Sequence, residues 1–327
     1  MNQYSGFDSY LSVTNFYINN YIYRHYSPNH FINSDGTKTL AKQLAGMRYA
    51  INYGKELIGD DLTLLKSTHY NAYKVNNPIN LGYALKDTLN SEFAHTLPSF
   101  YQDYLSQYYI INNSSSNQTI DASYALQDYS INAKTNYLSL DSNTAKYIVI
   151  DYSLTNPLSN VTVEFYNNEG KSMSYHEVSE YAYTVLPIPN DAHGVYIYCT
   201  NQNNPNEYID ATAFLLDNYA LDTRKFIAQF SNQTMTKDEI SASITLPVDS
   251  YVQTIVAYDP NWKVYDNGTE INTFISNDGF VGFTLPSGNH NIVLHYQPNL
   301  ITPTLIVTIS AFTLLYIMYK HKKDLME

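Results

Sequence analysis

Four side chains near the C-terminal end of the chain have the chemistry needed to bind a sugar. They are Tyr258, Asp259, Trp262 and Tyr265, and Trp262 is the only tryptophan in the sequence. Aromatic faces stack on sugar rings, while hydroxyl and carboxylate groups hydrogen-bond to sugar hydroxyls. The alternative is structural: Trp262 fills the core of a small β-sandwich, and Asp259 with Pro260 shapes a turn. We predict these four residues as the ligand-binding set, with both roles of Trp262 left open.

The other candidates do not converge on catalysis or on a metal ion. Asp60 and Asp61 are adjacent, so their side chains point apart and favour a solvated turn over a catalytic base. His290 and His295 are five positions apart on one expected strand, which puts them on opposite faces. A zinc site needs three or four converging ligands. The sequence therefore predicts no catalytic residue, no metal site and no cofactor.

An uncharged run, Leu300 to Tyr319, is followed directly by the basic sequence KHKK. A helix of that length spans about 30 Å, the thickness of the hydrocarbon core of a bilayer. Basic residues beside a spanning helix stay on the cytoplasmic side. We expect one transmembrane helix at 299–319, a cytoplasmic tail at 320–327, and the rest of the chain outside the plasma membrane. The alternative is a buried core helix.

The start of the chain conflicts with a simple single-pass protein. Residues 1–23 have neither a basic n-region nor a continuous apolar stretch, so no signal peptide is predicted. A large extracytoplasmic part must nevertheless cross the membrane. We therefore expect the chain to be the C-terminal part of a longer polytopic protein, with the lipid bilayer and an upstream membrane part or subunit as partners.

Composition limits the class of partner. The formal net charge is −12, and only 15% of residues are charged, whereas 34 are tyrosine. Nucleic-acid binders present basic patches, so a nucleic-acid partner is excluded. The single cysteine, Cys199, cannot form an internal disulfide and is expected to be a small buried hydrophobic residue. The absence of disulfides in an extracytoplasmic protein favours an origin on a Gram-positive bacterial surface over a eukaryotic secreted protein.

The pattern of strands and turns predicts a mainly β fold. Residues 1–111 are expected to form a mixed α/β region that ends in a helix opened by Pro98 and Ser99. Residues 112–239 begin with a polar linker and continue as an antiparallel β-sandwich. Residues 240–298 are expected to form a second, smaller antiparallel β-sandwich beside the membrane. Within it, Asn267-Gly268 and Asp278-Gly279 are expected to be two-residue hairpin turns.

The second unit also resembles a known family. The chain contains Y-D-x-x-W-x-V-x-x-N-G at 258–268, G-F-V-G at 279–282, L-P-S-G-N-H at 285–290, and Tyr296 before the apolar run. This series closely resembles the C-terminal juxtamembrane domain of YfhO-type bacterial membrane proteins. Less specific similarities, at 6–15 (GFDSYLSVTN) and 44–51 (LAGMRYAI), extend the resemblance over the whole chain.

The resemblance implies a membrane glycosyltransferase of the GT-C type, which adds sugars to lipoteichoic acid or a related surface polymer from a polyprenyl-phosphate sugar. In that family the catalytic acid lies between early transmembrane helices, which have no counterpart here, so no catalytic residue is carried over. The chain is then expected to be the extracytoplasmic, accessory portion of such an enzyme. Its ligand is expected to be a cell-surface glycan or a lipid-linked sugar. The alternative is a membrane-anchored surface module that binds glycans or a partner protein.

Overall fold

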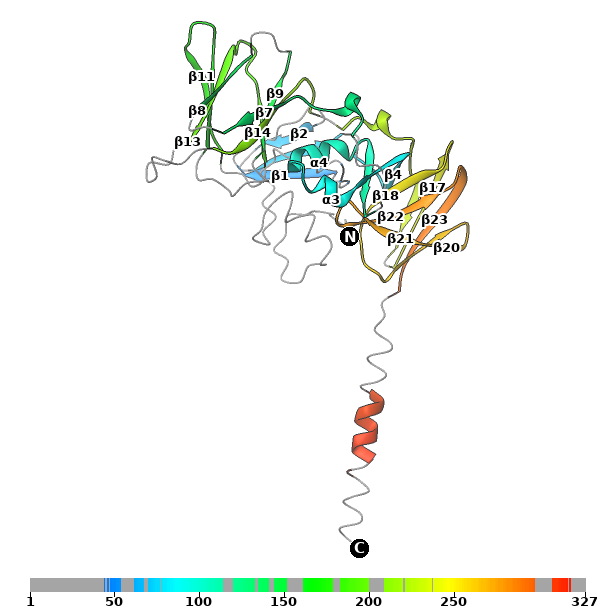
Figure 1. Ribbon diagram of the computed structural model, residues 1–327. Coiled ribbons are helices and arrows are strands. Elements are labelled where there is room, and N and C mark those ends of the chain that lie inside the picture. The colour runs from blue at the N-terminus through cyan, green and yellow to red at the C-terminus, as the bar shows by residue number, and fades with distance from the viewer. Residues whose placement is uncertain are drawn as a thin grey trace.

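The computed structural model describes residues 44, 46, 48–53, 62–67, 70–76, 78–113, 120–132, 135–140, 144–151, 161–178, 183–199, 209–219, 221–236, 238–297, 308–316 and 318. Over these residues the fold is mainly β, with several antiparallel sheets and a few short helices (Figure 1). The prediction of a mainly β protein is confirmed.

The first sandwich pairs two four-stranded antiparallel sheets. One has the order β11-β10-β13-β8 and the other the order β12-β9-β14-β7. The strands are β7 (Asp128–Ile131), β8 (Thr135–Ser139), β9 (Tyr147–Asp151), β10 (Val161–Tyr166), β11 (Ser172–Val178), β12 (Tyr183–Pro187), β13 (Gly194–Cys199) and β14 (Ala211–Leu216). Inward-facing residues of both sheets, among them Val163, Phe165, Ile148 and Ile197, form one buried core. The alternation of buried and more exposed residues along β10 and β14 gives these strands one face toward this core.

The second sandwich is built from two five-stranded sheets, with the orders β15-β4-β18-β22-β21 and β16-β17-β23-β19-β20. Its strands are β4 (Gly82–Leu85), β15 (Ala228–Gln229), β16 (Ser231–Met235), β17 (Glu239–Leu246), β18 (Ser250–Ala257), β19 (Trp262–Asp266), β20 (Thr269–Ile271), β21 (Thr273–Ser276), β22 (Phe280–Leu285) and β23 (Gly288–Tyr296). Strand β4 comes from the region before residue 112, yet it lies inside this sheet between β15 and β18.

The remaining elements lie between and beside the sandwiches. They are the sheet β1-β3-β2 (Tyr49–Tyr53, Tyr70–Val75, Leu62–Ser67), the parallel pair β5 (Asp87–Asn90) and β6 (Tyr109–Asn112), the helices α3 (Ser91–Ala94) and α4 (Ser99–Leu105), and the 3-10 turns η1 (Ala122–Tyr124) and η2 (Thr223–Lys225). The carboxylate of Asp151, at the end of β9, accepts a 2.6 Å hydrogen bond from the backbone N–H of Phe100 in the first turn of α4. Pro98, the N-cap residue of α4, makes no side-chain capping bond, so Asp151 supplies the missing acceptor.

A second core joins the two sandwiches. Phe100 of α4 packs with Tyr83 and Leu85 of β4 and with Tyr183 and Phe214 of the first sandwich. The sheet β12-β9-β14-β7 is therefore covered on both faces, which explains why β9 (YIVID) is buried at every position. Strand β4 also contributes to the core of the second sandwich through Leu81, just before it, and Ala84.

Two local predictions need correction. The helix that opens at Ser99 ends at Leu105, because residues from Tyr109 onward pair with β5 as a parallel strand. In the hairpin between β21 and β22 the two left-handed residues are Asn277 (φ +45°) and Asp278 (φ +62°), one position before the predicted Asp278-Gly279. The Asn267-Gly268 hairpin is confirmed, with φ of +47° and +86°.

The predicted spanning helix lies only partly in the described part of the chain. Residues 308–316 and 318 are helical, whereas all of 299–307 and all of the 320–327 tail fall outside the described residues. Among the helices that are described, none is both long enough and apolar enough to span a bilayer. Asp60, Asp61 and the 114–119 part of the predicted linker also lie outside the described residues, as does the side chain of Cys199.

Candidate functional site

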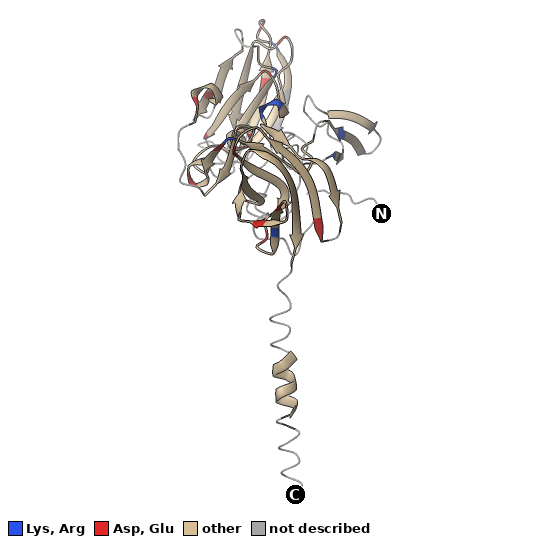
Figure 2. Ribbon diagram, turned by 90° about the vertical axis from the view of Figure 1, so that its right-hand side faces the viewer, with Lys and Arg blue, Asp and Glu red and all other residues tan. Residues whose placement is uncertain are grey.

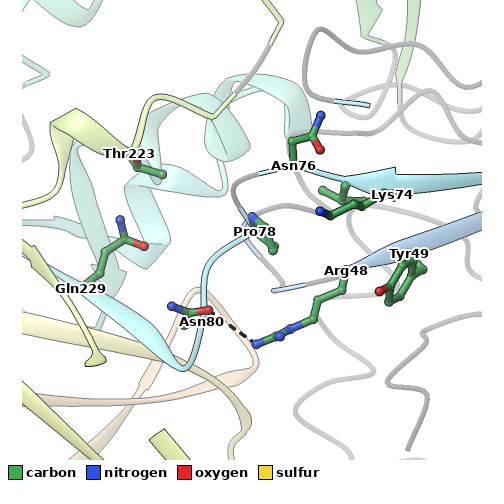
Figure 3. Close-up of a pocket in the computed structure, with 9 residues that line it drawn as sticks. Arg48, Tyr49, Lys74, Asn76, Pro78, Asn80, Thr223 and Gln229 are labelled. Atoms are coloured by element: carbon green, nitrogen blue, oxygen red, sulfur yellow. Dashed lines mark hydrogen bonds between the residues drawn. The ribbon is translucent and has the colours of Figure 1, made fainter. Parts of the chain in front are cut away.

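A polar pocket of about 530 Å³ opens beside the sheet β1-β3-β2 (Figure 3). One wall comes from the start of β1 and the end of β3, and the other comes from the turn η2 and from β15. The segment that leads from β3 to β4 forms the floor. The lining residues are Arg48, Tyr49, Lys74, Val75, Asn76, Pro78, Asn80, Thr223 and Gln229.

Backbone pairing fixes where the two cationic residues sit. The backbone N–H of Val75 donates a 3.0 Å hydrogen bond to the carbonyl of Arg48, which extends the β1–β3 ladder by one residue. Lys74 is the direct cross-strand partner of Tyr49, the residue after Arg48. The two basic side chains therefore leave neighbouring positions of adjacent strands, and both reach the pocket.

Among the described residues that line it, the pocket has two basic side chains and no acidic one. Arg48 and Lys74 are the charged residues that line it, and the strand sequences YAINY, LTLLKS and YNAYKV contain two lysines and no acid. Within the described residues, Lys74 has no ion-pair partner, and the Arg48 guanidinium bonds only to the neutral Asn80, at 3.5 Å. The chain as a whole has a net charge of −12, and Figure 2 marks its basic residues in blue and its acidic residues in red. A pocket whose described charged residues are both basic contrasts with that overall negative charge.

The side chains that line the pocket are hydrogen-bond donors suited to binding an anion. Arginine and lysine are strong donors to phosphate oxygens, and the amides of Asn76, Asn80 and Gln229 with the hydroxyl of Thr223 add neutral donors. Among the described residues that line the pocket there is no carboxylate, imidazole or thiol. The arrangement is suited to holding an anionic group such as a phosphate.

The predicted sugar-binding residues lie elsewhere, around the turn between β18 and β19. Asp259 accepts a hydrogen bond from the backbone N–H of Asn261 at 2.8 Å, and the backbone N–H of Trp262 donates to the Asp259 carbonyl at 3.0 Å. The hydroxyl of Tyr296 donates to the Asp259 carboxylate at 3.4 Å, and the Tyr296 ring meets Trp262 edge to face at 5.1 Å. Asp259 thus shapes a turn, as its structural alternative expects.

The structure brings three of the four predicted residues together and separates the fourth. Trp262 and Tyr258 are partly buried and pack against the core of the second sandwich. Tyr265 is an odd number of positions from Trp262 on β19, so it lies on the opposite face, where its hydroxyl accepts a 3.4 Å hydrogen bond from Gln297. Trp262 stands at the edge of the core rather than at its centre. A ligand-binding role for these residues stays a prediction.

The motif histidine His290 has a structural setting. It is 5% exposed, and its Nδ1 lies 2.9 Å from the carboxylate of Asp266 while its Nε2 lies 2.9 Å from the carbonyl of Pro286. It therefore ties β23 to β19 and to the preceding turn. Nowhere in the described parts of the chain do three His, Cys, Asp or Glu side chains gather as metal ligands would.

The pocket was not among the residues predicted from sequence. Its cations come from the middle of the LAGMRYAI segment and from a strand 26 positions further on, and neither stands in a charged cluster. The usable signal was a basic residue on each of two adjacent strands that contain no acid, in an acidic chain.

Comparison with known proteins yields one family and no curated relative. The family model described as bacterial membrane protein YfhO matches residues 1–308. None of the curated proteins matches the chain. Among solved structures, a mutant form of arabinofuranosyltransferase AftD from mycobacteria is 14% identical, with a TM-score of 0.22, over 47% of this chain and 13% of that one. A secreted protein of Eubacterium rectale, itself titled as putative, is 10% identical, with a TM-score of 0.23, over 76% of this chain and 92% of that one. At such TM-scores neither likeness carries an argument.

Proposed function

The chain belongs to the YfhO family of bacterial membrane proteins, and from this we propose that it is the extracytoplasmic C-terminal portion of a polytopic membrane glycosyltransferase. The enzyme would glycosylate a cell-surface polymer such as lipoteichoic acid from a lipid-linked sugar. This portion would hold a substrate and leave the chemistry to a membrane-embedded part.

The cationic pocket is the observation that carries the proposal. Polyprenyl-phosphate sugars and polymers of the lipoteichoic acid type both carry phosphate, whereas a neutral glycan does not. Arg48 and Lys74 offer charged donors, and no carboxylate is among the described residues that line the pocket with them. Since the chain as a whole is acidic, phosphate would be repelled from most of its surface and favoured here.

The placement at the membrane rests on the uncharged run after Leu300 and the KHKK sequence that follows it. We propose a single C-terminal span with a cytoplasmic C-terminus and with both sandwiches outside the cell. Protease added to intact cells should then degrade the sandwiches and spare a C-terminal tag. A tag that is cleaved from outside would reverse this orientation.

The test of substrate holding compares a phosphate polymer with its phosphate-free product. The full chain in lipid nanodiscs is titrated with lipoteichoic acid and with the same material after hydrofluoric acid has cleaved its phosphodiesters. The double substitution Arg48→Glu and Lys74→Glu should weaken binding of the intact polymer by at least about tenfold, since each lost charge contact is worth on the order of 1 kcal/mol. The hydrolysate should bind neither protein at this site.

A matched control is Lys171→Glu, which makes the same charge change as either one of the two pocket substitutions, at an exposed residue of the β10–β11 hairpin. It should leave the affinity for the polymer unchanged. Equal losses for the control and for the pocket variants would mean that net charge alone governs binding. That result would remove the pocket from the proposal.

A further inference from the structure

The outer face of the sheet β11-β10-β13-β8 carries a row of exposed tyrosines. Tyr137 of β8 and Tyr196 of β13 are direct cross-strand partners, and they are 52% and 37% exposed. Their ring centroids lie 4.9 Å apart with an interplanar angle of 48°. Tyr166 of β10 meets the Tyr196 ring edge to face at 5.2 Å. We call Tyr137, Tyr166 and Tyr196 the tyrosine row.

A glycine makes room for the most exposed ring. Gly194 is on β13, two residues before Tyr196 and diagonal to Tyr137. A Cβ placed on Gly194 would lie 2.7 Å from Cζ of Tyr137, closer than real Cβ atoms come to other atoms. The Tyr137 ring therefore lies across the backbone of its neighbouring strand, which holds one face of the ring against protein and leaves the other to solvent.

One carboxylate stands beside the row in a fixed orientation. Glu164 of β10 is the cross-strand partner of Tyr196 on its other side. Hydrogen bonds from Ser172 first, then from the hydroxyls of Tyr166 and Tyr198, lower the pKa of Glu164 below its ordinary value. The Tyr198 hydroxyl lies 3.1 Å from Oε2 of Glu164. The face thus presents aromatic rings beside an ionised acceptor whose position is set by three hydroxyls.

This combination selects for one class of ligand. Sugar rings offer C–H faces that pack on aromatic rings and hydroxyls that donate to a carboxylate. A phosphate-bearing ligand would be repelled by Glu164, and Tyr137, Tyr166 and Tyr196 carry no positive charge that would offset this repulsion. Met173 is the one exposed aliphatic side chain on the described residues of this sheet, so the exposed apolar surface of the face is mainly aromatic.

We propose that the tyrosine row and Glu164 form a binding surface for a neutral oligosaccharide. It is separate from the pocket at Arg48 and Lys74, and it goes beyond the proposed function because it holds whether or not the pocket takes a phosphate.

The experiment presents the full chain in nanodiscs to a panel of neutral oligosaccharides, namely hexamers of glucose, galactose, mannose and N-acetylglucosamine. At least one should bind, and Tyr137→Ala and Tyr196→Ala should each weaken that binding by about tenfold or more. Gly194→Ala should weaken it as well, because the added methyl group displaces the Tyr137 ring without removing it. Thermal unfolding should show that the exposed substitutions Tyr137→Ala and Tyr196→Ala leave the sandwich folded.

The control is Met235→Ala, which removes an exposed apolar side chain of β16 in the other sandwich and should leave oligosaccharide binding unchanged. Binding of the hexamer should also survive Arg48→Glu, so a failure of the pocket proposal would not be mistaken for a failure of this one. Either of two results would overturn the surface: no hexamer in the panel binds, or binding persists in both tyrosine variants. Self-association that is lost in Tyr196→Ala without any saccharide bound would overturn it in favour of a protein contact.

Discussion

Gly82→Ala tests how strand β4 ties the two sandwiches together. Gly82 pairs with Thr254 of β18. A Cβ on Gly82 would overlap the backbone carbonyl oxygen of Gln253 and lie 2.8 Å from Cα of Thr254. Both clashing atoms belong to the backbone, so no side-chain rotation relieves the contact and β4 must move away from β18.

The cost can be estimated from the bonds that this movement strains. The N–H of Ile255 donates to the carbonyl of Leu81 at 2.8 Å, and the N–H of Phe230 donates to the carbonyl of Gly82 at 3.3 Å. Overpacking costs about 1–3 kcal/mol, and each weakened hydrogen bond adds on the order of 1 kcal/mol. We expect a loss near 3 kcal/mol, which lowers the melting temperature of a unit of this size by roughly 6–12 °C.

The assay uses the fact that Trp262 is the only tryptophan and lies in the second sandwich. Its fluorescence reports the unfolding of that unit, while circular dichroism reports all the sheets. The control is Gly268→Ala in the same sandwich, where φ is +86° and a Cβ would meet nothing within 4 Å. It should cost only the left-handed strain of about 1–2 kcal/mol. If Gly82→Ala melts at the wild-type temperature, or Gly268→Ala costs more, the reasoning about β4 is wrong.

Three other substitutions test particular contacts. His290→Ala should lower stability by about 2–3 kcal/mol in urea unfolding, because it leaves the Asp266 carboxylate partly buried without its imidazole partner; an unchanged midpoint would contradict this. Asp151→Ala should cost about 1–2 kcal/mol by the same method, since the N–H of Phe100 loses its acceptor, and a neutral result would deny its capping role. Burial lowers the pKa of His176 from its ordinary 6.5, so the unfolded chain takes up a proton that the folded chain does not. Stability should therefore be full above about pH 6.5 and fall as the pH drops toward the folded pKa, and His176→Gln should flatten this limb of a urea midpoint series between pH 5.5 and 7.5.

Some strands could be predicted from the sequence alone, whereas the short strand β4 could not. The strands at 161–166 and 280–285 are recognisable in the sequence, because their apolar side chains alternate or cluster between clear turns. Strand β4 (GYAL) was missed because it is short and is buried on every residue between two cores. The helix at Ser99 was predicted too long because its end is set by a parallel pairing with β5, which lies outside any local window.

The site residues show the same division. The turn around Asp259 follows from local chemistry and was foreseen as an alternative. The pocket depends on β1 pairing with β3 so that Arg48 and Lys74 both line it, and a single sequence does not give the register of that pairing. Tyr137 and Tyr196 could not be predicted as a binding surface because the chain has 34 tyrosines, and only the three-dimensional fold shows which of them are exposed.

The position of β4 has a consequence for the order in which this chain can fold. Leu85 pairs with Tyr251, so β4 leaves the ribosome long before its partner β18 exists. Pairings between distant segments slow folding, and an apolar strand without its neighbours is prone to wrong association. The hydrophobic centre around Tyr83 and Phe100 also includes residues as late as Phe226. We expect that neither sandwich reaches its final state until most of the polypeptide has been made, and that a chaperone or the translocation machinery shields β4 in the meantime.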